Sequence, residues 1–340
     1  MLVSLASLFA LSSAVAAVPA RGPAWTTLTP IPVKRQEHTS VTLHDKIWMV
    51  GGILEDLSTT PRIDVYDPST NAWTSSLPAP MPLGLNHPNV AVVKDKIYVL
   101  GGLALNADGF TWGARNDSFE YSPRTNVWTR LPDFPAAAVP RGSASMGVAG
   151  DVIVLAGGMK ALVLIPEGLQ DTVATVSAFN VRTRKWLPAS AIPDMPAPRD
   201  HAGAVVVGKT LYVVGGRDHG QHNVRGTVFS LDLRSRLDHG QPKWKVLNTT
   251  MPTPRGGLSA AAVGKKIYTF GGEGNPEAAT GVFPQVEAYD LKANKWSKLA
   301  DMTSPRHGTS ATALNGKIYI PGGGDLIGGN PMTINEVYSP

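Results

Sequence analysis

The sequence predicts an all-β protein in which six copies of one four-stranded unit close into a ring. Three observations lead to this prediction. The stretch Lys46–Gly52, an apolar strand that ends in a glycine pair, returns five more times along the chain. In most copies an aromatic residue and then a tryptophan follow. The last copy lacks its tryptophan, whereas an extra one, Trp25, stands near the N-terminus.

The glycine pairs define the repeat length. They begin at Gly51, Gly101, Gly157, Gly215, Gly271 and Gly322. A period near fifty residues indicates one supersecondary unit repeated along the chain. We therefore expect one domain over 18–340, with repeats at roughly 35–80, 84–135, 141–192, 199–250, 255–302 and 306–340, the last completed by 23–29.

Turn residues divide each repeat into four short strands. In the first repeat these are expected at 39–43, 47–50, 63–66 and around Trp73, with a His44-Asp45 turn and Pro68 as breaks. An aromatic residue and a tryptophan stand seven apart at Tyr66/Trp73, Tyr121/Trp128, Phe179/Trp186 and Tyr289/Trp296. In the fourth repeat Leu231 and Trp244 are separated further, by an inserted loop.

The two ends of the chain complement each other. The sixth repeat stops after Val337-Tyr338, before a fourth strand, and Trp25-Thr-Thr-Leu28 precedes the first repeat without partners of its own. We expect the Trp25 strand to become the outer strand of the last unit. This pairing closes the ring and leaves no terminal repeat that needs a cap.

A proline-arginine pair introduces most first strands, and with the glycine pair, aromatic and tryptophan it resembles the Kelch repeat. The resemblance covers Trp25 to Pro340. It implies a six-bladed Kelch β-propeller of four-stranded blades, closed by the Trp25 strand, with the tryptophans and tyrosines packed between neighbouring blades. It also implies that the arginines tie blade to blade: Arg35, Arg141, Arg199, Arg255 and Arg306.

Composition and the N-terminus bear on localisation. The segment Leu2–Ala17 is almost wholly apolar and ends in small residues, which predicts a signal peptide over 1–17 and a secreted protein. A membrane anchor is the alternative, but the segment is shorter than the ~20 residues a span needs. Asn116 and Asn248 stand in glycosylation sequons. The absence of cysteine excludes disulfides and thiolate chemistry.

Charge argues against two classes of partner. The formal charge of +5 is spread along the chain without a block of like charges, so no nucleic-acid partner is expected. No membrane partner is expected either, and the predicted protein is a monomer. The resemblance instead implies a protein, glycan or small molecule bound at one end of the central channel.

The resemblance places two sets of loops at that end. One set precedes each innermost strand and the other follows each glycine pair. Ile, Leu and Met follow the first three glycine pairs, whereas charged or small residues follow the last three, so we expect one apolar and one charged half. The candidate ligand-binding residues are Glu37, His201, Arg217, Asp218, Glu273 and Asp325.

No metal or other cofactor is expected from these patterns. The 218–222 loop holds an aspartate and two histidines, but a glycine-containing loop does not hold metal geometry. Plant specifier proteins, which are Kelch propellers, bind iron through Glu-x-x-x-Asp-x-x-x-His; here Glu167 and Asp171 are followed by Thr175. Galactose oxidase needs a tyrosine-cysteine crosslink, which a chain without cysteine cannot form.

The leading functional hypothesis is a secreted binding module, because the structural repeat pattern is complete whereas no complete set of catalytic residues is found. The alternative is a small-molecule enzyme, either an isomerase or epimerase of sugars or a biosynthetic cyclase, with Glu273, His201 or Arg217 as acid, base or anion clamp. Gly272-Glu273 resembles the motif of the sialic acid epimerase, but Ala279 replaces its arginine. An intracellular adaptor is disfavoured by the leader. No catalytic residue is assigned.

Overall fold

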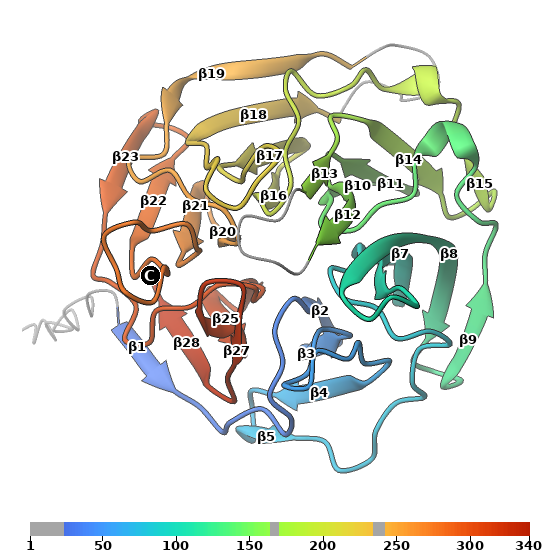
Figure 1. The fold of residues 1–340 in the computed structure, drawn as a ribbon, viewed down its shortest axis with the longest axis horizontal. Coiled ribbons are helices and arrows are strands. Elements are labelled where there is room, and N and C mark those ends of the chain that lie inside the picture. Colours follow the sequence, from blue (N-terminus) through green and yellow to red (C-terminus); the bar gives the residue numbers. More distant parts are fainter. Residues whose placement is uncertain (1–23, 164–169, 234–241) are drawn as a thin grey trace, which may run out of the picture.

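The computed structural model describes residues 24–163, 170–233 and 242–340. Six antiparallel sheets stand around a central axis, each with its first strand innermost (Figure 1). The predicted six-bladed propeller with four-stranded blades is confirmed. The predicted leader at 1–17 lies outside the described residues. Within the part of the chain that the structure describes, no helix has the length and apolar character to cross a membrane.

The first three blades follow the predicted strand order. Blade one contains β2 (Thr39–Leu43), β3 (Lys46–Val50), β4 (Ile63–Asp67) and β5 (Ala72–Trp73). Blade two contains β6 (Val90–Val93), β7 (Lys96–Leu105), β8 (Thr111–Ser122) and β9 (Val127–Arg130). Blade three contains β10 (Ser145–Ala149), β11 (Val152–Ala156), β14 (Val176–Asn180) and β15 (Lys185–Trp186).

The remaining blades repeat the pattern. Blade four contains β16 (Gly203–Val207), β17 (Thr210–Val214), β18 (Thr227–Asp232) and β19 (Trp244–Thr250). Blade five contains β20 (Ser259–Val263), β21 (Lys266–Phe270), β22 (Val286–Asp290) and β23 (Lys295–Lys298). Blade six contains β24 (Thr312–Leu314), β25 (Lys317–Pro321), β28 (Asn335–Ser339) and, from the other end of the chain, β1 (Ala24–Thr27).

The ring closes through β1, as predicted. This strand runs antiparallel to β28, with Trp25 opposite Tyr338, so the first and the last described strands meet in one blade (Figure 1). The Trp25 ring also packs edge-on against Phe270 of blade five, with centroids 5.8 Å apart. The N-terminal strand therefore completes the last blade and contacts its neighbour.

Tryptophans connect neighbouring blades. Each stands opposite the expected aromatic or leucine on the adjacent strand, for example Tyr66 opposite Trp73. In four blades the indole Nε1–H donates to a backbone carbonyl about fifty residues earlier: Trp73 to Thr29, Trp128 to Ala79, Trp186 to Pro132 and Trp244 to Pro193. The interblade role that the Kelch resemblance implies for these residues is therefore present.

The repeat arginines act differently from the expectation. Three of them each contact a carboxylate in the third strand of their own blade: Arg35 with Asp64, Arg255 with Glu287 and Arg306 with Glu336. Their guanidinium groups therefore tie strands within one blade rather than joining two blades. The link between blades is made instead by the backbone, because the Gly272 amide donates to the Arg306 carbonyl at 3.0 Å.

Extensions of the sheets in two parts of the propeller were not predicted. In blade two, β7 and β8 run on past the glycine pair, and β8 pairs with β12 (Met159–Val163), which belongs to blade three. The short β13 (Gln170–Thr172) then pairs with β12. In blade six, β26 (Gly324–Leu326) and β27 (Gly329–Pro331) form a separate hairpin. These extensions lie at one end of the channel, where their residues line a pocket.

Candidate functional site

Six residues, one from each blade, form a ring around the channel just before the innermost strands. This neck ring consists of Glu37, His87, Ser143, His201, Gly257 and Gly308. All six have a positive φ, between 46° and 62°. Five backbone N–H groups of the ring donate to the carbonyl of the preceding member, at 2.6–3.2 Å. The sixth, that of His201, donates to Ser143 Oγ at 3.0 Å.

All members of the neck ring have a left-handed conformation, and its four side chains line the channel. Such a conformation disfavours residues with a Cβ, and it recurs here because the ring of hydrogen bonds holds it. Glycine occupies the position in blades five and six, where a Cβ on Gly308 would meet the Glu37 carboxylate at 2.5 Å. The ring therefore carries two histidines, one glutamate and one serine, and has glycines at the two positions where neighbouring side chains occupy the space.

A second layer of residues lies directly outside the neck ring. Each residue after a glycine pair forms a bridge with the residue before a neck-ring member, as in Asp200 with Arg217 and Gly256 with Glu273. The two predicted loop sets therefore meet at the same end of the channel.

A buried ion-pair network occupies blades four and five of this layer. Arg217 Nη1 lies 2.7 Å from Glu273 Oε1, and its Nε lies 3.3 Å from Asp200 Oδ1. The other Glu273 oxygen accepts from the Gly328 amide at 2.7 Å. All three charged side chains are at most 2% exposed. Arg217 is therefore committed to two carboxylates.

Charges around Glu273 shift several pKa values. Burial alone would raise the pKa of Glu273, but His307 and Arg217 hold it at about 2. Burial opposes protonation of His307, yet Glu273 and Glu37 raise its pKa to about 9. Burial and the Arg217 charge lower the pKa of His201. Glu273 is therefore ionised near neutral pH, which excludes it as a general acid there.

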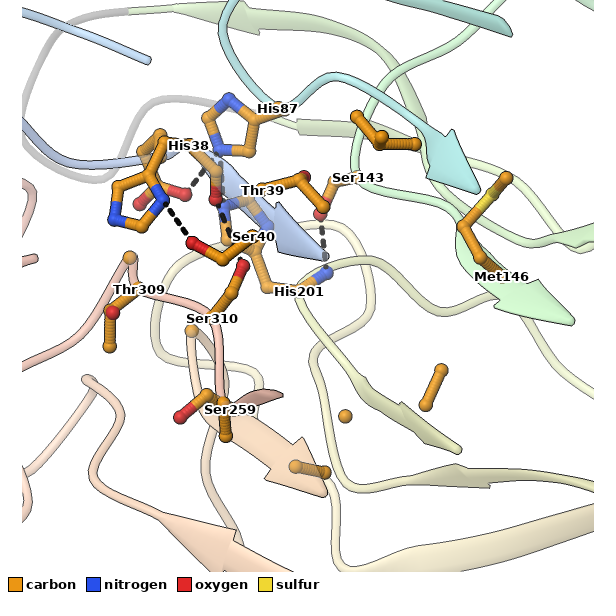
Figure 2. A pocket seen from close by; sticks show the side chains of 18 of the residues that line it. His38, Thr39, Ser40, His87, Ser143, Met146, His201, Ser259, Thr309 and Ser310 are labelled. Atoms are coloured by element: carbon orange, nitrogen blue, oxygen red, sulfur yellow. Dashed lines mark hydrogen bonds and ion pairs between the residues drawn. The ribbon is translucent and has the colours of Figure 1, made fainter. Parts of the chain in front are cut away.

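Two cavities meet at the neck ring and share Glu37, His87 and His201. The first, of about 250 Å³, is the channel between the innermost strands. Figure 2 shows it lined by small polar side chains such as Ser40, Ser259 and Thr309, with His87 and His201 at its edge. The second, the mouth pocket, has about 460 Å³ and lies on the other side of the ring.

The mouth pocket has an apolar and a polar part. Ile53, Trp112 and Leu162 line it from the first three blades, whereas Arg217 and Glu273 line it from the next two. The expected division holds for the residues that follow the glycine pairs, but Gln36, Glu37, His87 and Gln170 add polar groups from the first three blades, and Ile327 adds an apolar one from blade six. Leu162 reaches the pocket through the pairing of β12 with β8.

The structure brings together four of the predicted binding residues: Glu37, His201, Arg217 and Glu273 all line the mouth pocket. The other two predicted residues lie away from these four. Asp218 is partly exposed and contacts His219 Nδ1 at 2.5 Å. The Asp325 carboxylate accepts a hydrogen bond from Asn330 in the β26–β27 hairpin. Neither of these two lines the pocket. The sequon residues Asn116 and Asn248 lie exposed within β8 and β19.

Sequence reasoning did not select several pocket residues. His87 stands in a predicted loop before an innermost strand, and so does His307, which contacts the pocket residues Glu37 and Glu273. Alignment of the repeats was the signal that could have selected both. Trp112 and Gln170 come from segments outside the repeat pattern, and no repeat signal marks them.

Comparison with known protein families gives two matches. The Kelch-repeats domain described for KLHDC2, KLHL20 and DRC7 matches residues 166–339, and the Kelch motif matches 34–76 and 85–135. Together they fall on all the blades.

Similar proteins include several Kelch-like proteins. Kelch-like protein terF of Aspergillus terreus is 41% identical over 318 residues, which cover 92% of this chain and 66% of terF. Kelch-like protein 36 of Bos taurus is 24% identical over 86% of this chain, but the match covers 44% of its own length. Both relatives are therefore longer than the part they share with this chain. The solved structure of YjhT superposes with a TM-score of 0.73 at 18% identity, over 91% of this chain and 95% of that one, a likeness of fold.

Proposed function

The chain belongs to the Kelch-repeat family, and from that premise we propose that it is a binding module whose mouth pocket holds a small, largely apolar organic molecule. The family's propellers generally serve as binding modules, and the pocket has the volume and the mixed lining of a small-molecule site.

The proposal rests chiefly on buried polar atoms that border the pocket without a partner. Trp112 Nε1 and Gln170 Oε1 are buried and have no hydrogen-bond partner among the described residues. Both residues are at most 3% exposed and line the mouth pocket. Buried donors and acceptors in folded proteins nearly always have partners. A ligand that accepts from the indole and donates to the amide would provide them.

The charges of the pocket argue against an anionic ligand. Arg217 is the one Arg or Lys among the described lining residues, and its guanidinium already contacts Glu273 and Asp200. An anionic ligand would have to compete with those carboxylates. This argues against the anion-clamp role considered for Arg217. We therefore expect a neutral compound with an apolar body and one or two oxygen-bearing groups.

The experiment is a thermal-shift screen of neutral, oxygen-bearing ring compounds, followed by calorimetry of the hits. Trp112→Phe removes the indole N–H while keeping an aromatic ring, and should weaken a hit about tenfold, the worth of one hydrogen bond. Trp128→Phe is the matched control, because its indole bonds Ala79 outside the pocket. Hits that bind both variants as tightly as the original protein would exclude this pocket.

An enzyme that acts on the bound molecule is a second candidate. It is favoured by the buried contact of His87 Nε2 with Glu37 Oε2, at 3.0 Å, on the wall of the pocket. One or two positioned groups are enough for acid–base catalysis of an isomerisation or a cyclisation. Incubation of each hit with the protein, followed by mass spectrometry and NMR of the compound, separates the two candidates, since a binding module returns the compound unchanged.

We also propose that the protein is secreted and glycosylated, on the basis of the apolar leader and the exposed Asn116 and Asn248 side chains. Expression of the full chain in a eukaryotic host should give protein in the medium whose mass falls after glycosidase treatment. Protein retained in the cells at its unmodified mass would contradict both parts.

A further inference from the structure

Three side chains of the neck ring converge on one point. His87 Nε2 lies 2.9 Å from His201 Nε2 and 3.0 Å from Glu37 Oε2. Each residue comes from a different blade, and the side chains are only 3%, 3% and 11% exposed. The planes of the two imidazole rings stand at 76° to each other, with the ring centroids 4.8 Å apart.

Hydrogen bonds on the far sides of the rings define which nitrogens carry protons. His201 Nδ1 lies 2.5 Å from Asp200 Oδ1, an acceptor, so Nδ1 carries a proton and Nε2 of a neutral ring presents a lone pair. His87 Nδ1 lies 2.5 Å from Asn86 Oδ1, and with the amide in this orientation the His87 ring also carries its proton on Nδ1. Two lone pairs and a carboxylate oxygen therefore point at one another, an arrangement that requires positive charge between them.

We propose that Glu37, His87 and His201 bind a divalent first-row transition metal ion. A tetrahedral ion with ligands at 2.0–2.1 Å places its ligand atoms about 3.3 Å apart, a few tenths of an ångström more than the 2.9 and 3.0 Å from His87 Nε2 to His201 Nε2 and Glu37 Oε2. Two imidazoles and one carboxylate are a ligand set of zinc enzymes and of non-haem iron sites. Asp200 and Asn86 stand where outer hydrogen-bond acceptors of metal-binding histidines stand.

The neighbouring group of Glu37, Glu273 and His307 is a weaker candidate. Its carboxylate and imidazole atoms also converge, but His307 Nδ1 lies 3.5 Å from an oxygen of each glutamate. An imidazolium between two carboxylates satisfies that geometry without a metal. His307 Nε2 also faces the Leu326 carbonyl at 2.9 Å, which requires a proton there.

The proposed ion would sit at the constriction between the channel and the mouth pocket, since its three ligands border both cavities. With three protein ligands, a coordination position remains open toward the cavities. The inference does not depend on the organic ligand proposed above, because the metal alone can be tested. It differs from the loop at 218–222 that the sequence drew attention to.

The test uses tag-free protein dialysed against EDTA and titrated with Co²⁺, followed by visible absorption and calorimetry. We expect one ion per chain, displaced by Zn²⁺. His87→Gln and His201→Gln should each abolish stoichiometric binding. Asp200→Asn should weaken it 10–100-fold, the usual effect of losing an outer partner. His44→Gln with His219→Gln removes two exposed histidines and should change nothing.

The competing arrangement is a proton on His87 Nε2, shared with Glu37 and His201. If this arrangement is present, the original protein binds no Co²⁺ in the titration, and that result would overturn the proposal. Binding that survives both neck-ring variants but is lost with His44 and His219 would also overturn it. Should the neck-ring variants fail to fold, anomalous diffraction from Co²⁺-soaked crystals of the original protein decides. A peak between His87 and His201 supports the site, and peaks only at surface histidines refute it.

Discussion

Replacement of Gly271 by alanine should destabilise the propeller far more than its backbone conformation alone requires. Gly271 is the first glycine of the fifth pair and has φ +54°. A Cβ there would overlap the Arg306 carbonyl oxygen of blade six and would lie 3.0 Å from Met302 Sδ. That carbonyl accepts from the Gly272 amide at 3.0 Å. The added methyl would therefore push apart the backbone link between two blades.

The magnitude follows from two contributions. A left-handed alanine costs about 1–2 kcal/mol, less roughly 0.4–1 kcal/mol because alanine restricts the unfolded chain. Displacing the carbonyl leaves a buried amide without a partner, which costs about 1–3 kcal/mol, and disturbs the packing of Arg306. We expect a loss of about 3 kcal/mol in the free energy of unfolding.

The assay is urea denaturation followed by tryptophan fluorescence, with Gly264→Ala as the matched control. Gly264 has φ +61° and open space where a Cβ would stand, so its variant carries the conformational cost alone and should lose about 1 kcal/mol. Equal losses in the two variants would refute the reasoning that the glycine pair is required by contact with the next blade.

Three further predictions concern other contacts. Trp25→Ala should cost about 3 kcal/mol, because its ring packs on two aromatic neighbours, and should speed amide exchange in β28; unchanged exchange would count against closure by β1. Glu287→Gln should cost about 3–5 kcal/mol in urea denaturation by leaving Arg255 buried without its partner, and a loss below 1 kcal/mol would contradict this. Burial alone would raise the pKa of Glu120, but contacts that include Lys96 lower it. The ion pairs of Glu120 therefore stabilise the fold fully above its unfolded-state pKa of about 4.3, and this stabilisation is lost as the pH falls through the lower folded-state pKa. Glu120→Gln should therefore lose about 1 kcal/mol at pH 7, and the loss should shrink as the pH is lowered below the folded-state pKa.

The repeat pattern was sufficient to predict the blades because each mark has a local physical cause. The glycine pairs occupy positive φ values, and Trp25 lacks any partner except the incomplete sixth unit. The role of the arginines could not be obtained this way. Asp64, Glu287 and Glu336 stand at equivalent strand positions, but only coordinates show that each faces the arginine of its own blade.

The candidate site was predictable where it follows the repeat and not elsewhere. Glu37, His201, Arg217 and Glu273 come from equivalent loops, so their meeting at one end of the channel follows from the symmetry of the fold. Asp218 and Asp325 are single residues further along those loops, where the path is no longer repeated. Trp112 reaches the pocket because β8 is long, and strand length beyond the glycine pair is not encoded in the repeat.

The hydrogen-bonded neck ring has a consequence for how this architecture diversifies. Five of its six hydrogen bonds join main-chain atoms only, so the ring of hydrogen bonds does not depend on most of the side chains at these positions. Substituting its members alters the chemistry at the axis while the sheets that hold them stay in place. A descendant of this chain could thus acquire a new specificity through changes at half a dozen codons, each contributed by a different blade.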